Sequence, residues 1–98
     1  MNTLDVRRVV SVTQMFKSIQ GAADDVAALG ELKKFAKFFR ASDLFNSTFH
    51  AVEFLAGVDV QMLRTDPDVL VGVVDAGLNL EDILAARVWA LSFAREIN

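Results

Sequence analysis

Apolar residues recur every three or four positions over most of the chain, which is the spacing typical of amphipathic helices. Short polar or glycine-containing breaks separate the periodic segments and supply residues that favour helix ends, such as Gly21 and Gly57. The pattern predicts an all-α fold, a compact bundle of four to five helices with short connections. The expected helices cover about 3–20, 23–41, 43–56, 67–76 and 80–97.

The fourth of these segments carries the sharpest local signal in the chain. Asp66 suits the position before a helix, Pro67 suits its first turn, and Gly77 suits its end. A strand competes with the helix, because residues 69–74 are mostly β-branched and contain a glycine. We favour the helix, since no other segment reads as a strand that could pair with it.

Phenylalanine is concentrated in the middle of the sequence, and we expect it to form the core. Six of the eight Phe residues are Phe35, Phe38, Phe39, Phe45, Phe49 and Phe54. Phe45 and Phe49 are four apart, so they would share one face of a helix that begins after Ser42 or Asp43. Two tightly joined helices would then pack their rings together.

Helical periodicity also predicts which side chains are buried. Over 23–41 the expected buried stripe consists of Val26, Leu29, Leu32, Phe35, Ala36 and Phe39, with Phe38 lying off it. Over 80–97 the main stripe consists of Leu80, Ile83, Leu84, Val88 and Leu91. Trp89 and Phe93 form a second apolar strip on that helix, and we expect one of the two strips to remain exposed.

Composition indicates one domain, 1–98, with more apolar residues than a small core needs. The hydrophobic fraction is 53%, and the mean hydropathy is +0.35. Such a surplus favours a partner, a symmetry mate or a membrane surface as its cover. No run of 18 uncharged apolar residues is present, and no signal peptide is recognised. We therefore expect no transmembrane segment and a soluble, cytoplasmic protein.

Charge is divided unevenly along the chain. Residues 1–40 contain seven cationic side chains and four carboxylates, whereas residues 41–98 contain three and nine. The net charge of −3 therefore combines a basic first part with an acidic second part. Opposite charges at two ends favour head-to-tail or antiparallel association.

The residues that usually carry catalysis are scarce. There is no Cys and one His, His50, which has Glu53 one helical turn away. Two ligands do not complete a metal site, and Ser47, His50 and Asp43 lie on one short segment without a nucleophile elbow. We expect no catalytic, cofactor or metal site, and we do not expect an enzyme.

These observations favour a non-catalytic interaction or assembly module that binds a protein partner or itself. Small helical modules of this kind occur as subunits of larger assemblies, including viral particles, and as inhibitors of larger enzymes. We expect the aromatic anchors of the contact to be Phe38, Trp89 and Phe93. The expected charged rim consists of Lys33, Lys34, Lys37 and Arg40 on one side and of Asp75, Glu81 and Asp82 on the other.

The alternative is a small nucleic-acid-binding regulator that uses the basic face at 33–40. Its four cations could contact phosphates, and the aromatic ring of Phe38 lies beside them. Two observations weigh against it: the isoelectric point is about 4.9, and the expected helix 43–56 carries no Lys or Arg.

Overall fold

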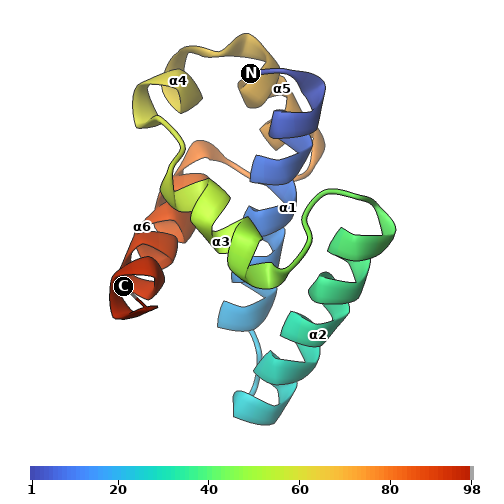
Figure 1. Ribbon diagram of the computed structural model, residues 1–98. Coiled ribbons are helices and arrows are strands. Elements are labelled where there is room, and N and C mark those ends of the chain that lie inside the picture. The colour runs from blue at the N-terminus through green and yellow to red at the C-terminus, as the bar shows by residue number, and fades with distance from the viewer. Residues whose placement is uncertain (98) are drawn as a thin grey trace.

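The computed structural model describes residues 1–97, which fold into six helices joined by short loops (Figure 1). The helices are α1 (Thr3–Gln20), α2 (Asp25–Ala41), α3 (Thr48–Ala56), α4 (Val60–Thr65), α5 (Pro67–Asp75) and α6 (Leu80–Ile97). The described residues form no strand, so the expected all-α bundle is confirmed, including the helix at 67–75. Between the expected helices 43–56 and 67–76, the chain forms a further short helix, α4.

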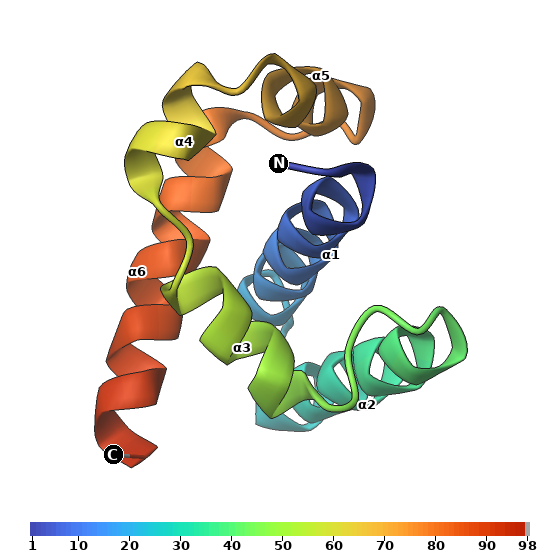
Figure 2. The same ribbon diagram turned by 45° about the horizontal axis from the view of Figure 1, so that its top comes forward.

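Helix α1 lies in the middle of the molecule. It packs against α2, α3, α5 and α6, and Figure 2 shows α2 and α5 on different sides of it. Val9, Val12, Thr13 and Met15 have no exposed surface, so α1 is buried around much of its circumference rather than along one stripe. This burial outweighs the weak helix propensity of its β-branched residues.

The helix starts follow the local sequence signals. Asp66 caps α5 by accepting a hydrogen bond from the Asp68 amide at 2.9 Å. Asn79 and Asp82 cap α6 reciprocally, with the Asp82 amide 2.9 Å from Asn79 Oδ1 and the Asn79 amide 3.0 Å from Asp82 Oδ2. The Asp66 cap was expected from the sequence, and both caps depend on residues only two or three positions apart.

Asp66 also contacts the amino group of Met1, which joins the first residue to the start of α5. The hydrogen bond between them raises the pKa of the Met1 amine and lowers the pKa of the Asp66 carboxyl.

The third helix is shorter than expected, and the prediction that it begins at 43 is wrong. Ser42 caps the end of α2 instead, and Asp43 has a positive φ of 57°. Leu44 and Phe45 then enter the core from a loop, and Ser47 caps α3. Phe45 and Phe49 consequently share no helix face. The reason is tertiary: burial of Leu44 and Phe45 is gained by breaking the helix.

The Phe-rich core is confirmed, although not every ring belongs to it. Phe39 and Phe45 are buried, with ring centroids 5.1 Å apart in an edge-to-face arrangement. Phe35 and Phe54 pack against this pair. Phe38 and Phe49 are exposed, although Phe38 still touches the ring of Phe39.

Two arginines hold the non-helical segments on either side of α3. Arg8 Nε of α1 donates to the carbonyl of Leu44 at 3.0 Å, and its guanidinium lies 5.4 Å from the ring centroid of Phe45. Arg87 Nε of α6 donates to the carbonyl of Val58 at 2.8 Å. No local sequence pattern indicates these two contacts, because their partners lie 36 and 29 positions apart in the chain.

The buried stripe expected on α2 is wrong in its first half. Only Phe39 is fully buried on this helix, whereas Val26 is 81% exposed and Leu29 is 51% exposed. Helix α2 packs on α1 and α3 and does not pack extensively on α6. Its first turns therefore lack the third neighbour that would have covered them.

The stripe expected on α6 is also wrong in part. Ile83, Ala86 and Ala90 face the core with no exposed surface, whereas Val88 is exposed. Helices α3 and α6 pack extensively against each other. The buried side of α6 includes small alanine side chains as well as Ile83, whereas Val88 lies outside it.

Two glycines in helix interiors give a matched prediction. A Cβ at Gly72 of α5 would lie 2.5 Å from Val6 Cγ1, whereas a Cβ at Gly30 of α2 would meet nothing within 4 Å. Ala gains about 1 kcal/mol over Gly in a helix, but overpacking costs about 1–3 kcal/mol. We expect Gly30→Ala to raise the free energy of unfolding by about 0.5–1 kcal/mol and Gly72→Ala to lower it by up to about 2 kcal/mol.

Urea denaturation measures both changes, and Val6→Ala is the control. Because Val6→Ala removes the clashing methyl group, Gly72→Ala should lower the free energy of unfolding by less in the Val6→Ala variant than in the wild type. Equal effects of Gly72→Ala in the two backgrounds would show that α1 and α5 are not in close contact at this point.

Candidate functional site

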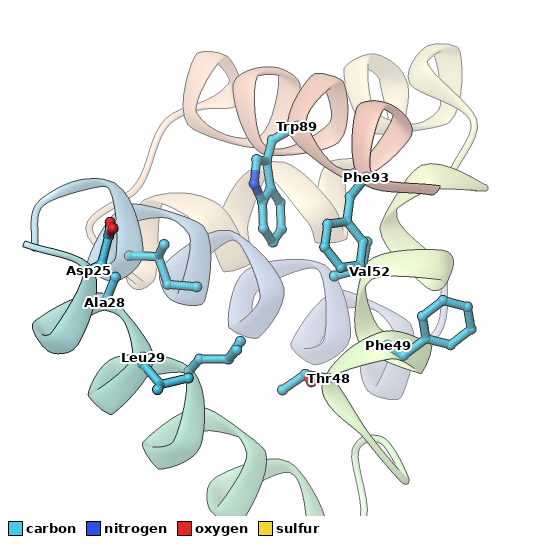
Figure 3. Close-up of a pocket in the computed structure, with 10 residues that line it drawn as sticks. Asp25, Ala28, Leu29, Thr48, Phe49, Val52, Trp89 and Phe93 are labelled. Atoms are coloured by element: carbon cyan, nitrogen blue, oxygen red, sulfur yellow. The ribbon is translucent and has the colours of Figure 1, made fainter. Parts of the chain in front are cut away.

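The main surface feature is an apolar groove that separates α2 from α6, here named the α2–α6 groove. Its volume is about 360 Å³. Residues from α2, α3 and α6 form its walls, and Ile19 of α1 also lines it (Figure 3). The other lining residues are Asp25, Ala28, Leu29, Leu32, Thr48, Phe49, Val52, Trp89 and Phe93.

Trp89 forms the centre of the groove and is held from two sides. The centroid of its ring system lies 5.5 Å from the ring centroid of Phe16 on α1. The corresponding distance to Phe93, one turn further along α6, is 6.1 Å. Figure 3 shows Trp89 pointing from α6 into the groove, with Leu29 on the α2 side and Phe49 at the α3 edge. Contacts with these two rings position Trp89 in the wall of the groove.

Large apolar side chains around the groove remain exposed. Leu29 is 51% exposed, Phe93 is 39% exposed, and Phe49 is also exposed. Single exposed apolar residues are common on protein surfaces, but here apolar side chains from three helices gather around one concave site.

The polar side chains that line the groove are Asp25 and Thr48. Neither has a neighbouring imidazole, thiol or amine in the lining that would activate it for acid–base or nucleophilic chemistry. The arrangement suits the burial of apolar side chains, with one carboxylate at the edge.

The structure brings together two of the three expected aromatic anchors. Trp89 and Phe93 stack at an interplanar angle of 30° within the groove. Phe38 is exposed outside it and lines a separate shallow hollow with Gln14, Lys34 and Phe35. A single contact surface centred on the groove therefore includes Trp89 and Phe93 but not Phe38.

The four expected cations gather along one side of α2. Lys33, Lys34, Lys37 and Arg40 are exposed and surround a shallow hollow at Gly30. Lys34 Nζ lies 4.0 Å from Glu31 Oε2, which is a weak surface pair. Positions 29, 33, 37 and 40 are three or four residues apart, so they follow one another along one side of the helix. The basic stripe therefore lies beside the Leu29 edge of the groove.

The three expected acidic residues differ in their exposure and in their contacts within the chain. Asp75 and Glu81 are exposed at the end of α5 and the start of α6. Asp82 is half-buried, caps its own helix and lies 3.4 Å from Lys17 Nζ of α1. Asp82 is thus occupied within the chain. The acidic segment and the basic stripe lie on different sides of α1 (Figures 1 and 2).

Three of the residues considered for catalysis or metal binding, Asp43, His50 and Glu53, line one hollow of about 450 Å³ together with Arg8. His50 and Glu53 are exposed on α3, and Ser47 Oγ accepts a hydrogen bond from the His50 amide at 3.2 Å as a helix cap. Among the described residues, no group of three or more His, Asp or Glu side chains is placed to hold a metal ion. Within the same residues, no helix is long and apolar enough to cross a membrane.

Sequence reasoning missed the α2 and α3 walls of the groove. Leu29, Leu32 and Val52 fitted core stripes, and Phe49 was assigned to the Phe-rich core. One signal was available: helix 23–41 is apolar on more than one side, so one side had to lack cover.

Comparison of the chain with protein-family models, curated proteins and solved structures finds no match. The function is therefore argued from the α2–α6 groove and its surroundings.

Proposed function

We propose that the protein is a non-catalytic interaction module whose α2–α6 groove binds the apolar face of a helix in a protein partner. The observation that carries the proposal is the groove itself, in which exposed Leu29, Phe49 and Phe93 surround a fixed Trp89. Burying these side chains would release apolar surface from water, which is the dominant favourable term in protein association.

A helix is the partner element that fits this site best. The walls are themselves helices, and an amphipathic helix places apolar anchors at intervals of three, four and seven residues into such a groove. The aromatic wall agrees with the enrichment of Trp and Phe at the centres of protein interfaces. Asp25 is one carboxylate in the lining, whereas four cations lie in the basic stripe beside the Leu29 edge, so the surrounding charge favours a partner helix with acidic flanks.

In this function the protein would work as a subunit of a larger assembly, for example a viral one, or as an inhibitor of a larger enzyme. The chain has no Cys, which suits a reducing compartment, and we propose the cytoplasm as its location.

Photo-crosslinking tests the proposal. A photoreactive phenylalanine analogue at Phe93 is expected to form a covalent adduct with a protein partner in the cells that naturally make the chain. The same analogue at Phe38 is the matched control, because Phe38 is a similarly exposed ring outside the groove. Adding Leu29→Glu should reduce the Phe93 adduct about tenfold or more, because it places a charge in the apolar site.

Equal adducts from Phe93 and Phe38, or an adduct that survives Leu29→Glu, would rule out the groove as the docking surface.

The second candidate function is nucleic-acid binding by the basic stripe on α2, favoured by its four exposed cations. Absence of any protein adduct, together with salt-sensitive oligonucleotide binding that Lys33→Glu and Lys37→Glu abolish, would replace the proposed function with this one.

A further inference from the structure

A second unpartnered apolar surface lies on α5, away from the α2–α6 groove. Leu70, Val71 and Val74 project outward, with Val71 60% exposed and Val74 72% exposed. Positions 70, 71 and 74 lie on one face of the helix, while Val69 and Val73 face the core. The outer face of α5 therefore carries apolar anchors at the spacing that a helix-binding groove accepts.

The charge around α5 is opposite to that beside the groove. Residues 59–82 contain six carboxylates and one cation, Arg64. Asp68 and Asp75 are exposed near the two ends of α5, and Glu81 is exposed close by. The groove is instead bordered by the basic stripe of α2 that contains Lys33 and Lys37.

From these two complementary surfaces we propose that the chain self-associates head to tail, with α5 of one copy seated in the α2–α6 groove of the next. Val71 and Val74 would meet Trp89 and Leu29, and the carboxylates flanking α5 would face the basic stripe. This inference rests on the proposed function, because it names a second copy of the chain as the partner of the same groove.

The interface is heterologous, since it joins two different surfaces. Helices α5 and α2 lie on different sides of α1, so α5 does not occupy the groove of its own chain (Figures 1 and 2). An open chain of such contacts would retain one free groove at one end and one free α5 at the other. Repetition of such a contact produces either a ring or an open filament.

The test mixes two variants that each lose one surface. Leu29→Glu disables the groove by adding a carboxylate that would repel the acidic α5 region. Val71→Glu with Val74→Glu disables α5 by placing two carboxylates against the apolar wall that contains Trp89, and like charges keep the two altered surfaces from pairing with each other. All three positions are largely exposed, so the fold should persist, and circular dichroism checks this. Val88→Lys on α6 is the control, since Val88 is exposed outside the groove.

Light scattering behind size exclusion is the measurement, over a wide range of protein concentrations. We expect wild type and Val88→Lys to form concentration-dependent oligomers that weaken with salt. Each surface variant alone should associate at least about tenfold more weakly. The mixture should form a 1:1 dimer of the 10.8 kDa chain and nothing larger, because one intact groove and one intact α5 remain.

Three results would overturn the inference: a wild type that stays monomeric, a mixture that does not dimerise, or an α5 variant that self-associates through its groove alone. A monomeric wild type would still agree with the proposed function if Phe93 crosslinks to a different protein.

Because the chain has no Cys, single cysteine substitutions give a second measurement. A mixture of Leu29→Cys and Val74→Cys chains should form a mixed disulfide on oxidation, whereas Leu29→Cys with Val88→Cys should not.

Discussion

Phe39→Ala is expected to lower the free energy of unfolding by about 3–5 kcal/mol. Phe39 is the largest side chain with no exposed surface, and its ring contacts those of Phe35, Phe38 and Phe45 at centroid distances of 6.0, 5.9 and 5.1 Å. Truncation would leave a cavity between α2 and the 42–47 loop. Thermal unfolding should shift downward by at least about 12 °C for a domain of this size.

Phe38→Ala is the matched control for this prediction. Phe38 is the adjacent residue on the same helix and is 45% exposed, so its truncation should cost less than about 1 kcal/mol. Urea and thermal denaturation of the two variants measure the difference. Similar losses for both would show that the Phe cluster is not centred on Phe39.

Arg8→Ala is expected to lower the free energy of unfolding by about 2–3 kcal/mol. The change removes a hydrogen bond from a charged donor to the Leu44 carbonyl, which contributes about 1.5–3 kcal/mol. It also removes cation–π contacts with Phe45 and Phe54, each contributing about 0.5–1 kcal/mol at a partly exposed site. The ion pair with Asp5 at 3.6 Å adds little.

Two substitutions test this assignment. Arg7→Ala removes an exposed cation from the preceding position and should change the stability by less than about 0.5 kcal/mol. Arg8→Lys keeps the charge but loses the planar guanidinium, so an intermediate loss is expected. Hydrogen exchange should also become faster at the amide of Leu44, which bonds to the Phe39 carbonyl at 3.0 Å. Indistinguishable effects of Arg8→Ala and Arg7→Ala would mean that Arg8 does not hold the loop.

The loop that Arg8 holds also shapes the candidate site. Residues 42–47 lead directly into α3, which contributes Thr48, Phe49 and Val52 to the groove. The contact between Arg8 and Leu44 thus helps to decide where the α3 wall of the groove lies.

The amino-acid sequence by itself determined the features that depend on close neighbours. Asp66 and Pro67 define the start of α5, and Asn79 and Asp82 define the start of α6, because capping hydrogen bonds reach only a few residues. The spacing of apolar residues determined the helical class for the same reason. Trp89 and Phe93 could be assigned to a shared strip, because they lie one turn apart.

Only the tertiary structure decided which apolar faces were covered. Helical spacing shows that Leu29 and Phe39 lie on the same side of α2, but Phe39 meets the 42–47 loop while Leu29 borders an open groove. On α6, which packs on both α3 and α1, Ala86 and Ala90 are buried and Val88 is exposed. Burial depends on the helix that arrives from elsewhere in the chain, and contacts between residues far apart in sequence leave no local pattern to read.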